Sequence, residues 1–170
     1  MRIFFLTISL FFCIALDMGS KIFVEDTVFG TWKEICVHPE INSAATVEYC
    51  RDNIISFTDF FSLHLSYNSG IAFSLPIHGI MLQIITLLLI GGILYQYFSV
   101  EYPKKSKLLD AGYVLILSGA LSHAYERIFV GHVVDFIAVK YFAILNIADI
   151  FISVGAFLLI LAYVIFRKSR

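Results

Sequence analysis

The sequence has 170 residues, of which 59% are hydrophobic and 15% are charged, and its mean hydropathy is +0.87. A soluble domain of this length is about 45–50% apolar. The surplus, gathered in long uncharged runs, therefore predicts a helical protein that crosses a membrane several times. The formal net charge is −1. No basic patch with interleaved aromatic residues lies outside the apolar runs, which argues against a nucleic-acid partner.

The first apolar run follows Arg2 and is expected to form a helix over residues 3–24. Ala15-Leu16-Asp17 matches poorly the small-x-small site at which a secretory signal peptide is cleaved, so we expect this helix to be retained. Near its outer end, Asp17 and Lys21 are spaced i,i+4 with the acid first. This is the favourable order for an ion pair on one helical face.

A polar segment over residues 25–74 comes next, and we expect it to lie outside the membrane. It is too small to bury a core alone. Loose alternation of apolar and polar residues in Ile54–Leu65 predicts short strands, and we expect a small sheet resting on the membrane surface. The aromatic residues available for an interfacial belt are Phe57, Phe60, Phe61 and Tyr67.

Two of the three cysteines, Cys36 and Cys50, lie in this outer segment. An exported, oxidising location permits a disulfide between them, whereas two free thiols in a loop are the alternative. A bridge over so short a loop would stabilise the fold by about 3 kcal/mol.

Three further apolar runs predict membrane-spanning helices over residues 75–98, 108–129 and 147–166. The first of them is long enough to cross the hydrocarbon core, which requires about 20 residues. Gly91-Gly92 within it would permit close helix packing. The expected fold class is therefore an all-α polytopic membrane protein, with one membrane domain over residues 1–170. It has four transmembrane helices and a small extracytoplasmic β-containing segment between the first two.

The positions of the basic residues predict the orientation. With four spans, Arg2, the lysines at 104–107 and the basic residues at 167–170 lie on one side, and the positive-inside rule makes that side cytoplasmic. Both termini are then cytoplasmic, and the short loop around residues 133–146 lies outside.

The last turns of the third run carry a polar stripe formed by Ser122, His123, Glu126 and Arg127. Residues at i, i+1, i+4 and i+5 share one side of a helix, and such a stripe at the end of a span needs partners inside the bundle. His123 and Glu126 alone could suggest a metal site. No second cluster of His and Cys accompanies them, so we expect no metal.

Asp135 and Asp149 lie on either side of the short outer loop, each at the edge of an apolar run. Consecutive spans would place both carboxylates at the same face of the membrane, where an ionisable residue is a candidate for function. Two carboxylates that share a site repel each other, so one pKa rises and a proton is shared between them. This is the chemistry of an aspartyl hydrolase. For Asp149 the alternative is an acid favoured in the first turn of a helix by the helix dipole.

Four short motifs occur in chain order. The first is Leu16-Asp17-Met18-Gly19-Ser20-Lys21, and the second is Asn68-Ser69-Gly70-Ile71-Ala72-Phe73-Ser74. The third comprises Gly119-Ala120-Leu121, Arg127 and Gly131-His132-Val133-Val134-Asp135-Phe136, and the fourth is Asn146-Ile147-Ala148-Asp149. Together the motifs cover nearly the full length of the chain. They resemble the motifs of the signal peptidase II family, the lipoprotein (prolipoprotein) signal peptidases.

The resemblance implies a four-helix aspartyl endopeptidase of the bacterial inner membrane. Such an enzyme removes the signal peptide from prolipoproteins after a diacylglyceryl group has been attached to the lipobox cysteine. It implies that Asp135 and Asp149 are the catalytic pair. The implied substrate-binding residues are Asn68, Gly70, Arg127, Asn146 and His123, and the implied supporting residues are Asp17, Lys21 and Glu126.

The same resemblance implies the ligands and partners. They are prolipoprotein substrates, membrane lipids and the cyclic-peptide inhibitors of the family. We expect no cofactor, no nucleic acid and a monomer.

The chain departs from the family pattern in its third motif. The family usually has Gly-Asn-x-x-Asp-Arg where this chain has Ser122-His123-Ala124-Tyr125-Glu126-Arg127. The outer segment is also longer than usual, and the loop between the aspartates is short. The alternative is a non-catalytic or specificity-altered paralogue that binds lipoprotein signal peptides. A small transporter is disfavoured because its acids would lie near the midplane of the membrane. A purely structural bundle would leave the polar stripe unexplained.

Overall fold

The computed structural model describes residues 1–30, 54–68, 70 and 80–168. Cys36 and Cys50 lie outside these residues, so their disulfide stays a prediction. The chain divides into two compact units. The helical unit comprises Met1–Asp17, Ser69–Val133 and Ile147–Arg170, and the sheet unit comprises Met18–Asn68 and Val134–Asn146. A single membrane domain over residues 1–170 also stays an expectation.

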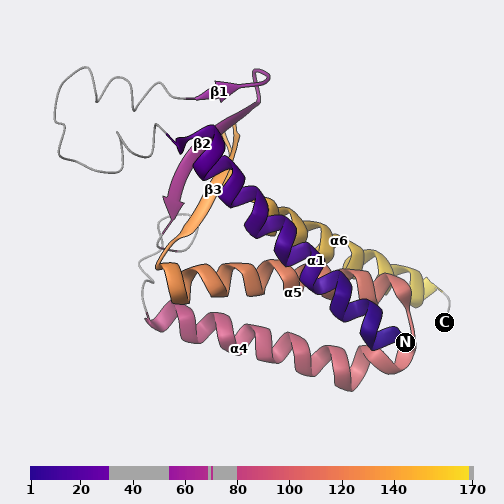
Figure 1. Cartoon of the computed structure of the whole chain (residues 1–170). Helices are drawn as coiled ribbons and strands as arrows, with labels where there is room; N and C mark the ends of the chain where they lie inside the picture. Colours follow the sequence, from indigo (N-terminus) through magenta and orange to yellow (C-terminus); the bar gives the residue numbers. More distant parts are fainter. Residues whose placement is uncertain (31–53, 69, 71–79, 169–170) are drawn as a thin grey trace, which may run out of the picture. The chain divides into compact units, whose positions relative to one another are not determined.

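The described residues form four long helices, whose positions agree closely with the apolar runs. Figure 1 labels them α1, α4, α5 and α6. Three of them are continued at their C-terminal ends by a π-helical turn, namely Phe23–Val28, Tyr97–Glu101 and Glu126–Val130. The α-helices are α1 (Arg2–Ile22), α4 (Ile80–Gln96), α5 (Lys107–Tyr125) and α6 (Ile147–Lys168).

Three segments within the described residues are long and apolar enough to cross a membrane: Arg2–Val28, Ile80–Lys104 and Ile147–Arg167. Helix α5 is not among them. It holds more of the buried residues than the other helices do, and Asp110, Ser118 and His123 lie on its buried side. Polar groups that face neighbouring helices lower the hydropathy of a helix without exposing charge to lipid. The fourth span predicted at 108–129 therefore stays an expectation.

Helices α5 and α6 pack so closely that their backbones touch at glycines. A Cβ added at Gly119 would lie 2.5 Å from the carbonyl oxygen of Ala148, and one at Gly155 would lie 2.7 Å from that of Gly112. The close packing that Gly91-Gly92 would permit is not seen among the described residues, because a Cβ at either position meets none of their atoms within 4 Å. The close approach thus joins the two helices that carry His123 and Asp149.

A partly buried polar cluster joins the helices near the start of α1. The Arg2 guanidinium donates to both carboxylate oxygens of Asp110, at 2.6 and 2.9 Å, and it lies 4.2 Å from the centre of the Tyr102 ring. The Tyr97 hydroxyl donates to the same carboxylate at 2.8 Å. Arg2 and Tyr97 thus both donate to the Asp110 carboxylate, and the Tyr102 ring covers the Arg2 guanidinium. Removing either charged partner would leave the other charge without compensation, which would destabilise the fold.

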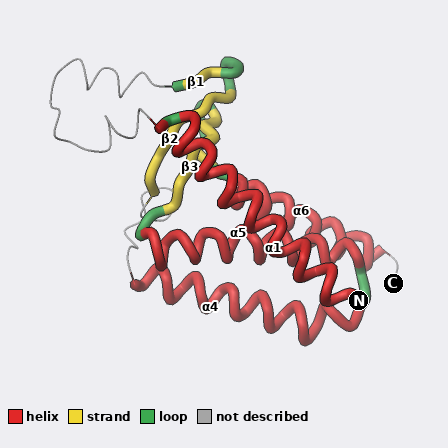
Figure 2. Tube along the Cα trace, viewed as in Figure 1, coloured by secondary structure: helices red, strands yellow, loops and turns green. Residues whose placement is uncertain are grey.

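The sheet formed by the described residues has four strands in the order β1-β2-β3-β4. Figure 2 colours the strands yellow and labels β1, β2 and β3. Its strands are β1 (Ile55–Ser56), β2 (Phe61–Asn68), β3 (Val133–Val139) and β4 (Ile144–Leu145). Antiparallel pairing places Ile55 opposite Leu63 and Ile137 opposite Leu145.

The strands predicted within Ile54–Leu65 are confirmed, although β2 extends to Asn68. The loop expected around residues 133–146 is instead largely a hairpin of β3 and β4. The run Val133-Val134-Asp135-Phe136-Ile137-Ala138-Val139 is rich in β-branched and aromatic residues, which favour strands. Asp135 therefore lies in a strand.

Candidate active site

Asp135 lies in the buried half of β3, between Val134 and Phe136, and is 6% exposed. The Nδ2 of Asn146 donates to its Oδ1 at 2.6 Å, and the Nδ2 of Asn68 donates to its Oδ2 at 3.2 Å. A buried carboxylate is costly unless its oxygens receive hydrogen bonds. The two amides meet this need, and they fix the plane of the carboxyl group. The structure thus brings together three residues that the sequence singled out.

Asn146 is itself fully buried, immediately before α6. Its Nδ2 also donates to the carbonyl oxygen of Val134, at 3.3 Å. One side chain therefore holds both the backbone and the carboxyl group of neighbouring β3 residues. The Val134 carbonyl was not anticipated from the sequence, because such a contact depends on β3 being a strand.

Asp149 lies in the first turn of α6 within the helical unit. Its Oδ1 is 3.2 Å from the Nε2 of His123, which lies in the last turn of α5 and is 8% exposed. The Asp149 side chain is 33% exposed. Within the part of the chain that the structure describes, no three His, Cys, Asp or Glu side chains are arranged to hold a metal ion.

Asp17 contacts the residue that precedes Asp149. Its Oδ1 accepts a hydrogen bond of 2.8 Å from the backbone N–H of Ala148, and its side chain is fully buried. The first N–H groups of a helix lack acceptors within that helix, and a carboxylate there also matches the helix dipole. Helix α1 thereby fixes the start of α6. Lys21 lies one turn later on α1 and is also buried, and the Asp17–Lys21 ion pair stays a prediction.

Arg127 lies in the π-helical turn that ends α5. Its Nη2 donates to the carbonyl oxygen of Gly70 at 3.2 Å, and its own carbonyl oxygen accepts from the Nε2 of Gln83 at 2.9 Å. Glu126 is buried in the same turn, which ends at Gly131 with a φ of 89°. The sequence did not point to Gln83, because a single amide in an apolar span carries no recognisable pattern.

The candidate residues are divided between the two units. The sheet unit contains Lys21, Asn68, Asp135 and Asn146. The other candidate residues in the described ranges belong to the helical unit. The pairing of the Asp135 and Asp149 carboxyl groups therefore stays a prediction.

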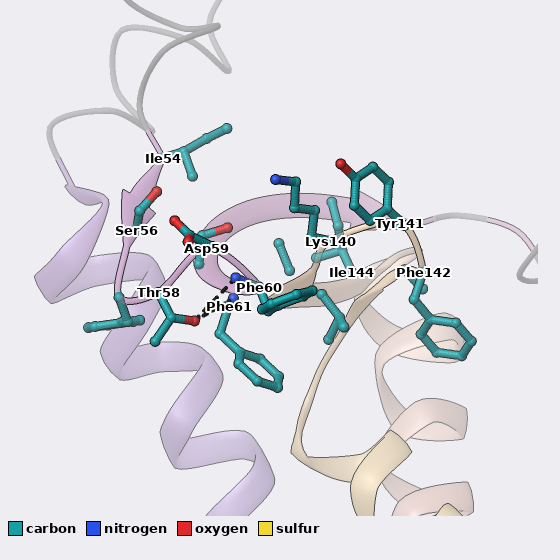
Figure 3. Close-up of a pocket in the computed structure, with 15 residues that line it drawn as sticks. Ile54, Ser56, Thr58, Asp59, Phe60, Phe61, Lys140, Tyr141, Phe142 and Ile144 are labelled. Atoms are coloured by element: carbon teal, nitrogen blue, oxygen red, sulfur yellow. Dashed lines mark hydrogen bonds between the residues drawn. The ribbon is translucent and has the colours of Figure 1, made fainter.

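The sheet unit also carries a hollow of about 830 Å³ between the turns of its two hairpins (Figure 3). The Thr58 Oγ1 accepts hydrogen bonds from the backbone N–H groups of Phe60 and Phe61, and the Lys140 N–H donates to the Phe60 carbonyl. The Thr58 contacts stabilise the β1–β2 turn, and the Lys140–Phe60 hydrogen bond links the two turns. The exposed aromatic residues around the hollow are Phe57, Phe60, Phe61, Tyr141 and Phe142.

Tyr67 behaves differently from the other aromatic residues proposed for an interfacial belt. It is half-buried, and its hydroxyl donates to Glu25 Oε1 at 2.8 Å. Burial, followed by the hydrogen bond to Glu25, raises the pKa of the Tyr67 phenol well above its ordinary value. The side chain therefore acts as a neutral link between β2 and the π-helical turn after α1.

Comparison with known sequences identifies one family. The family model described as "Signal peptidase (SPase) II" matches residues 9–165. A lipoprotein signal peptidase of Clostridium novyi (strain NT) is 38% identical over 138 residues, which cover 77% of this chain and 85% of that relative. One from Francisella tularensis subsp. novicida (strain U112) is 36% identical over 123 residues, covering 68% of this chain and 76% of the relative. The resemblance inferred from the four motifs is confirmed.

Two solved structures, each described as a bacterial membrane enzyme obtained by the in meso method, share the fold. One superposes with a TM-score of 0.70 at 21% identity, covering 97% of this chain and 90% of that chain. The other has a TM-score of 0.65 at 21% identity, covering 93% and 91%. The expected fold class, a mainly helical membrane protein with a small sheet, is confirmed.

Proposed function

The chain belongs to the signal peptidase (SPase) II family of membrane peptidases that act on lipoprotein signal peptides, and from this premise we propose that it is an aspartic endopeptidase. Its substrates are bacterial prolipoproteins that carry a diacylglyceryl group on the lipobox cysteine. The enzyme lies in the inner membrane with both termini in the cytoplasm, and it cuts at the extracytoplasmic side.

The environment of Asp135 supports this proposal most directly. A carboxyl group that is 6% exposed, with an amide donor on each oxygen, is held in one orientation within a strand. An acid that served only as a surface charge would need no such support. The second acid, Asp149, stands at the start of α6 with its own hydrogen-bonded partner, His123.

In the proposed mechanism the two carboxyl groups share the work of hydrolysis. The ionised carboxylate removes a proton from a water molecule as the water oxygen attacks the scissile carbonyl carbon. The protonated carboxyl group donates a hydrogen bond to the carbonyl oxygen and stabilises the negative charge that develops there. The tetrahedral intermediate then collapses and the C–N bond breaks, and the leaving amine takes the proton that the carboxylate had accepted from water. The pair titrates as a unit, so the two roles belong to the pair.

The residues around the acids bind the substrate in this proposal. Two hydrogen bonds hold Arg127 in place. Its guanidinium donates to the Gly70 carbonyl oxygen, and its own backbone carbonyl oxygen accepts from the Gln83 side chain. A guanidinium held in this way can orient a substrate carbonyl. The substrate's acyl chains remain in the bilayer beside the helices while its signal helix packs between the spans.

The test is cleavage of a purified diacylglyceryl-modified prolipoprotein by the protein in lipid nanodiscs. We expect Asp135→Asn and Asp149→Asn each to abolish turnover, whereas Asp59→Asn, which changes an exposed acid in the β1–β2 turn, retains it. Near-wild-type turnover by either site variant refutes the pairing. A wild-type protein that binds the substrate without cutting it would establish the alternative, a non-catalytic paralogue.

A further inference from the structure

His123 and Asp149 are brought together by a close contact between helices α5 and α6. Gly119 lies one turn before His123, and its backbone meets the Ala148 carbonyl so closely that an added Cβ would lie 2.5 Å from that oxygen. This contact places the end of α5 against the start of α6. At this junction the Nε2 of His123 lies 3.2 Å from Asp149 Oδ1.

The other ring nitrogen of His123 determines which tautomer fits. Among the described residues, the buried Nδ1 has no hydrogen-bond partner. With a single proton on the pair, Nε2–H donates to the Asp149 carboxylate and Nδ1 is left as an acceptor. A proton on Nδ1 would instead be a buried N–H with no acceptor among those residues, which is costly. The geometry thus favours a neutral imidazole that donates from Nε2.

Asp17 and His123 act on two parts of the same segment. Asp17 accepts from the Ala148 N–H and fixes the backbone immediately before Asp149. His123 then restrains the Asp149 side chain, which is 33% exposed and so more open to solvent than the Asp135 carboxyl group. A partly exposed side chain in the first turn of a helix has several rotamers available unless a partner selects one.

From these contacts we infer that His123 is a positioning residue for Asp149: it donates from Nε2 to Oδ1 and holds the carboxyl group in its reactive orientation. The inference rests on the proposed function, in which Asp149 is one of the catalytic pair. It differs from the substrate-binding role that the resemblance implies for His123.

The test compares glutamine and methionine at position 123. Both have nearly the same length and shape, but only glutamine places an N–H close to the position of the imidazole Nε2. We expect His123→Gln to keep kcat within about threefold of wild type, and His123→Met to lower kcat about 10- to 100-fold with KM unchanged. Ser122→Ala, which removes a buried hydroxyl from the same turn, should leave both constants unchanged.

Each other outcome overturns the inference. A raised KM with unchanged kcat would make His123 a substrate-binding residue, and wild-type kcat in His123→Met would remove its role. Equal losses in His123→Gln and His123→Met would point to shape rather than to the donor. If His123→Met does not fold, as judged by thermal unfolding, kcat of His123→Gln is compared with that of His123→Asn, whose amide nitrogen corresponds to Nδ1. A higher kcat for asparagine overturns the inference.

The wild type and Asp149→Asn, run alongside, separate this inference from the proposed function. Cleavage that survives in Asp149→Asn contradicts the proposed function itself. Loss of cleavage in Asp149→Asn together with full kcat in His123→Met contradicts only the role of His123.

Discussion

The Nδ2 of Asn146 lies 2.6 Å from Oδ1 of Asp135 and 3.3 Å from the carbonyl oxygen of Val134. This one buried amide joins the residue that precedes α6 to a strand residue whose carboxyl group is proposed to be catalytic. The geometry of the site therefore depends on a side chain that performs no chemistry of its own.

Replacing Asn146 by alanine removes the donor from a buried carboxylate oxygen. We expect Asn146→Ala to lower the free energy of unfolding by about 1–3 kcal/mol, because a buried polar group left without a partner bears its full desolvation cost. Prolipoprotein cleavage should fall in parallel. Thermal unfolding in detergent and the cleavage assay measure the two effects. Asn68→Ala removes the longer hydrogen bond of 3.2 Å, so it should lower the free energy of unfolding by less than Asn146→Ala does. A larger loss in Asn68→Ala would contradict this ranking.

A second prediction concerns the contact between α1 and α6. Asp17→Ala removes the acceptor of the Ala148 N–H, and we expect a loss of about 1–3 kcal/mol in the free energy of unfolding. Asp17→Asn keeps an oxygen acceptor while removing the charge, so it should retain most of the stability. The two variants are compared by thermal unfolding in the same detergent. Equal losses would show that the charge, rather than the acceptor, stabilises this position.

The helices and half of the sheet follow from patterns along the chain. Long uncharged runs predict spans because only a helix satisfies its own backbone groups in lipid. The strands around Ile54–Leu65 follow from alternation. The β3–β4 hairpin was missed because a short run between two spans was interpreted as a loop, although its β-branched residues signalled a strand. No local pattern reveals that His123 contacts Asp149 or that Asp17 contacts Ala148, because these pairs form only when separate helices pack.

The Tyr67–Glu25 hydrogen bond gives a prediction that depends on pH. Burial raises the pKa of Tyr67, so the fold favours the neutral phenol. The stability that this preference provides is present below the ordinary tyrosine pKa of about 10 and is lost as the pH rises above it. Wild type should exceed Tyr67→Phe by about 1 kcal/mol at neutral pH, and this difference should shrink above pH about 10. Thermal unfolding of both proteins across this range measures it, and a difference independent of pH would contradict it.

The close contact between α5 and α6 gives the last prediction. A methyl group at Gly119 would lie 2.5 Å from the Ala148 carbonyl oxygen, and a backbone atom cannot move aside without shifting the helix. We expect Gly119→Ala to cost about 1–3 kcal/mol, as overpacking does in other cores. The shift also separates His123 from Asp149, so kcat should fall more than the loss of stability alone explains.

Gly91→Ala is the matched control, because a Cβ there meets open space. Alanine should stabilise α4 by about 0.5–1 kcal/mol through its higher helix propensity. Unfolding midpoints and kcat for the two variants measure both effects, and equal behaviour of the two alanines would show that the glycine contact does not hold α5 against α6.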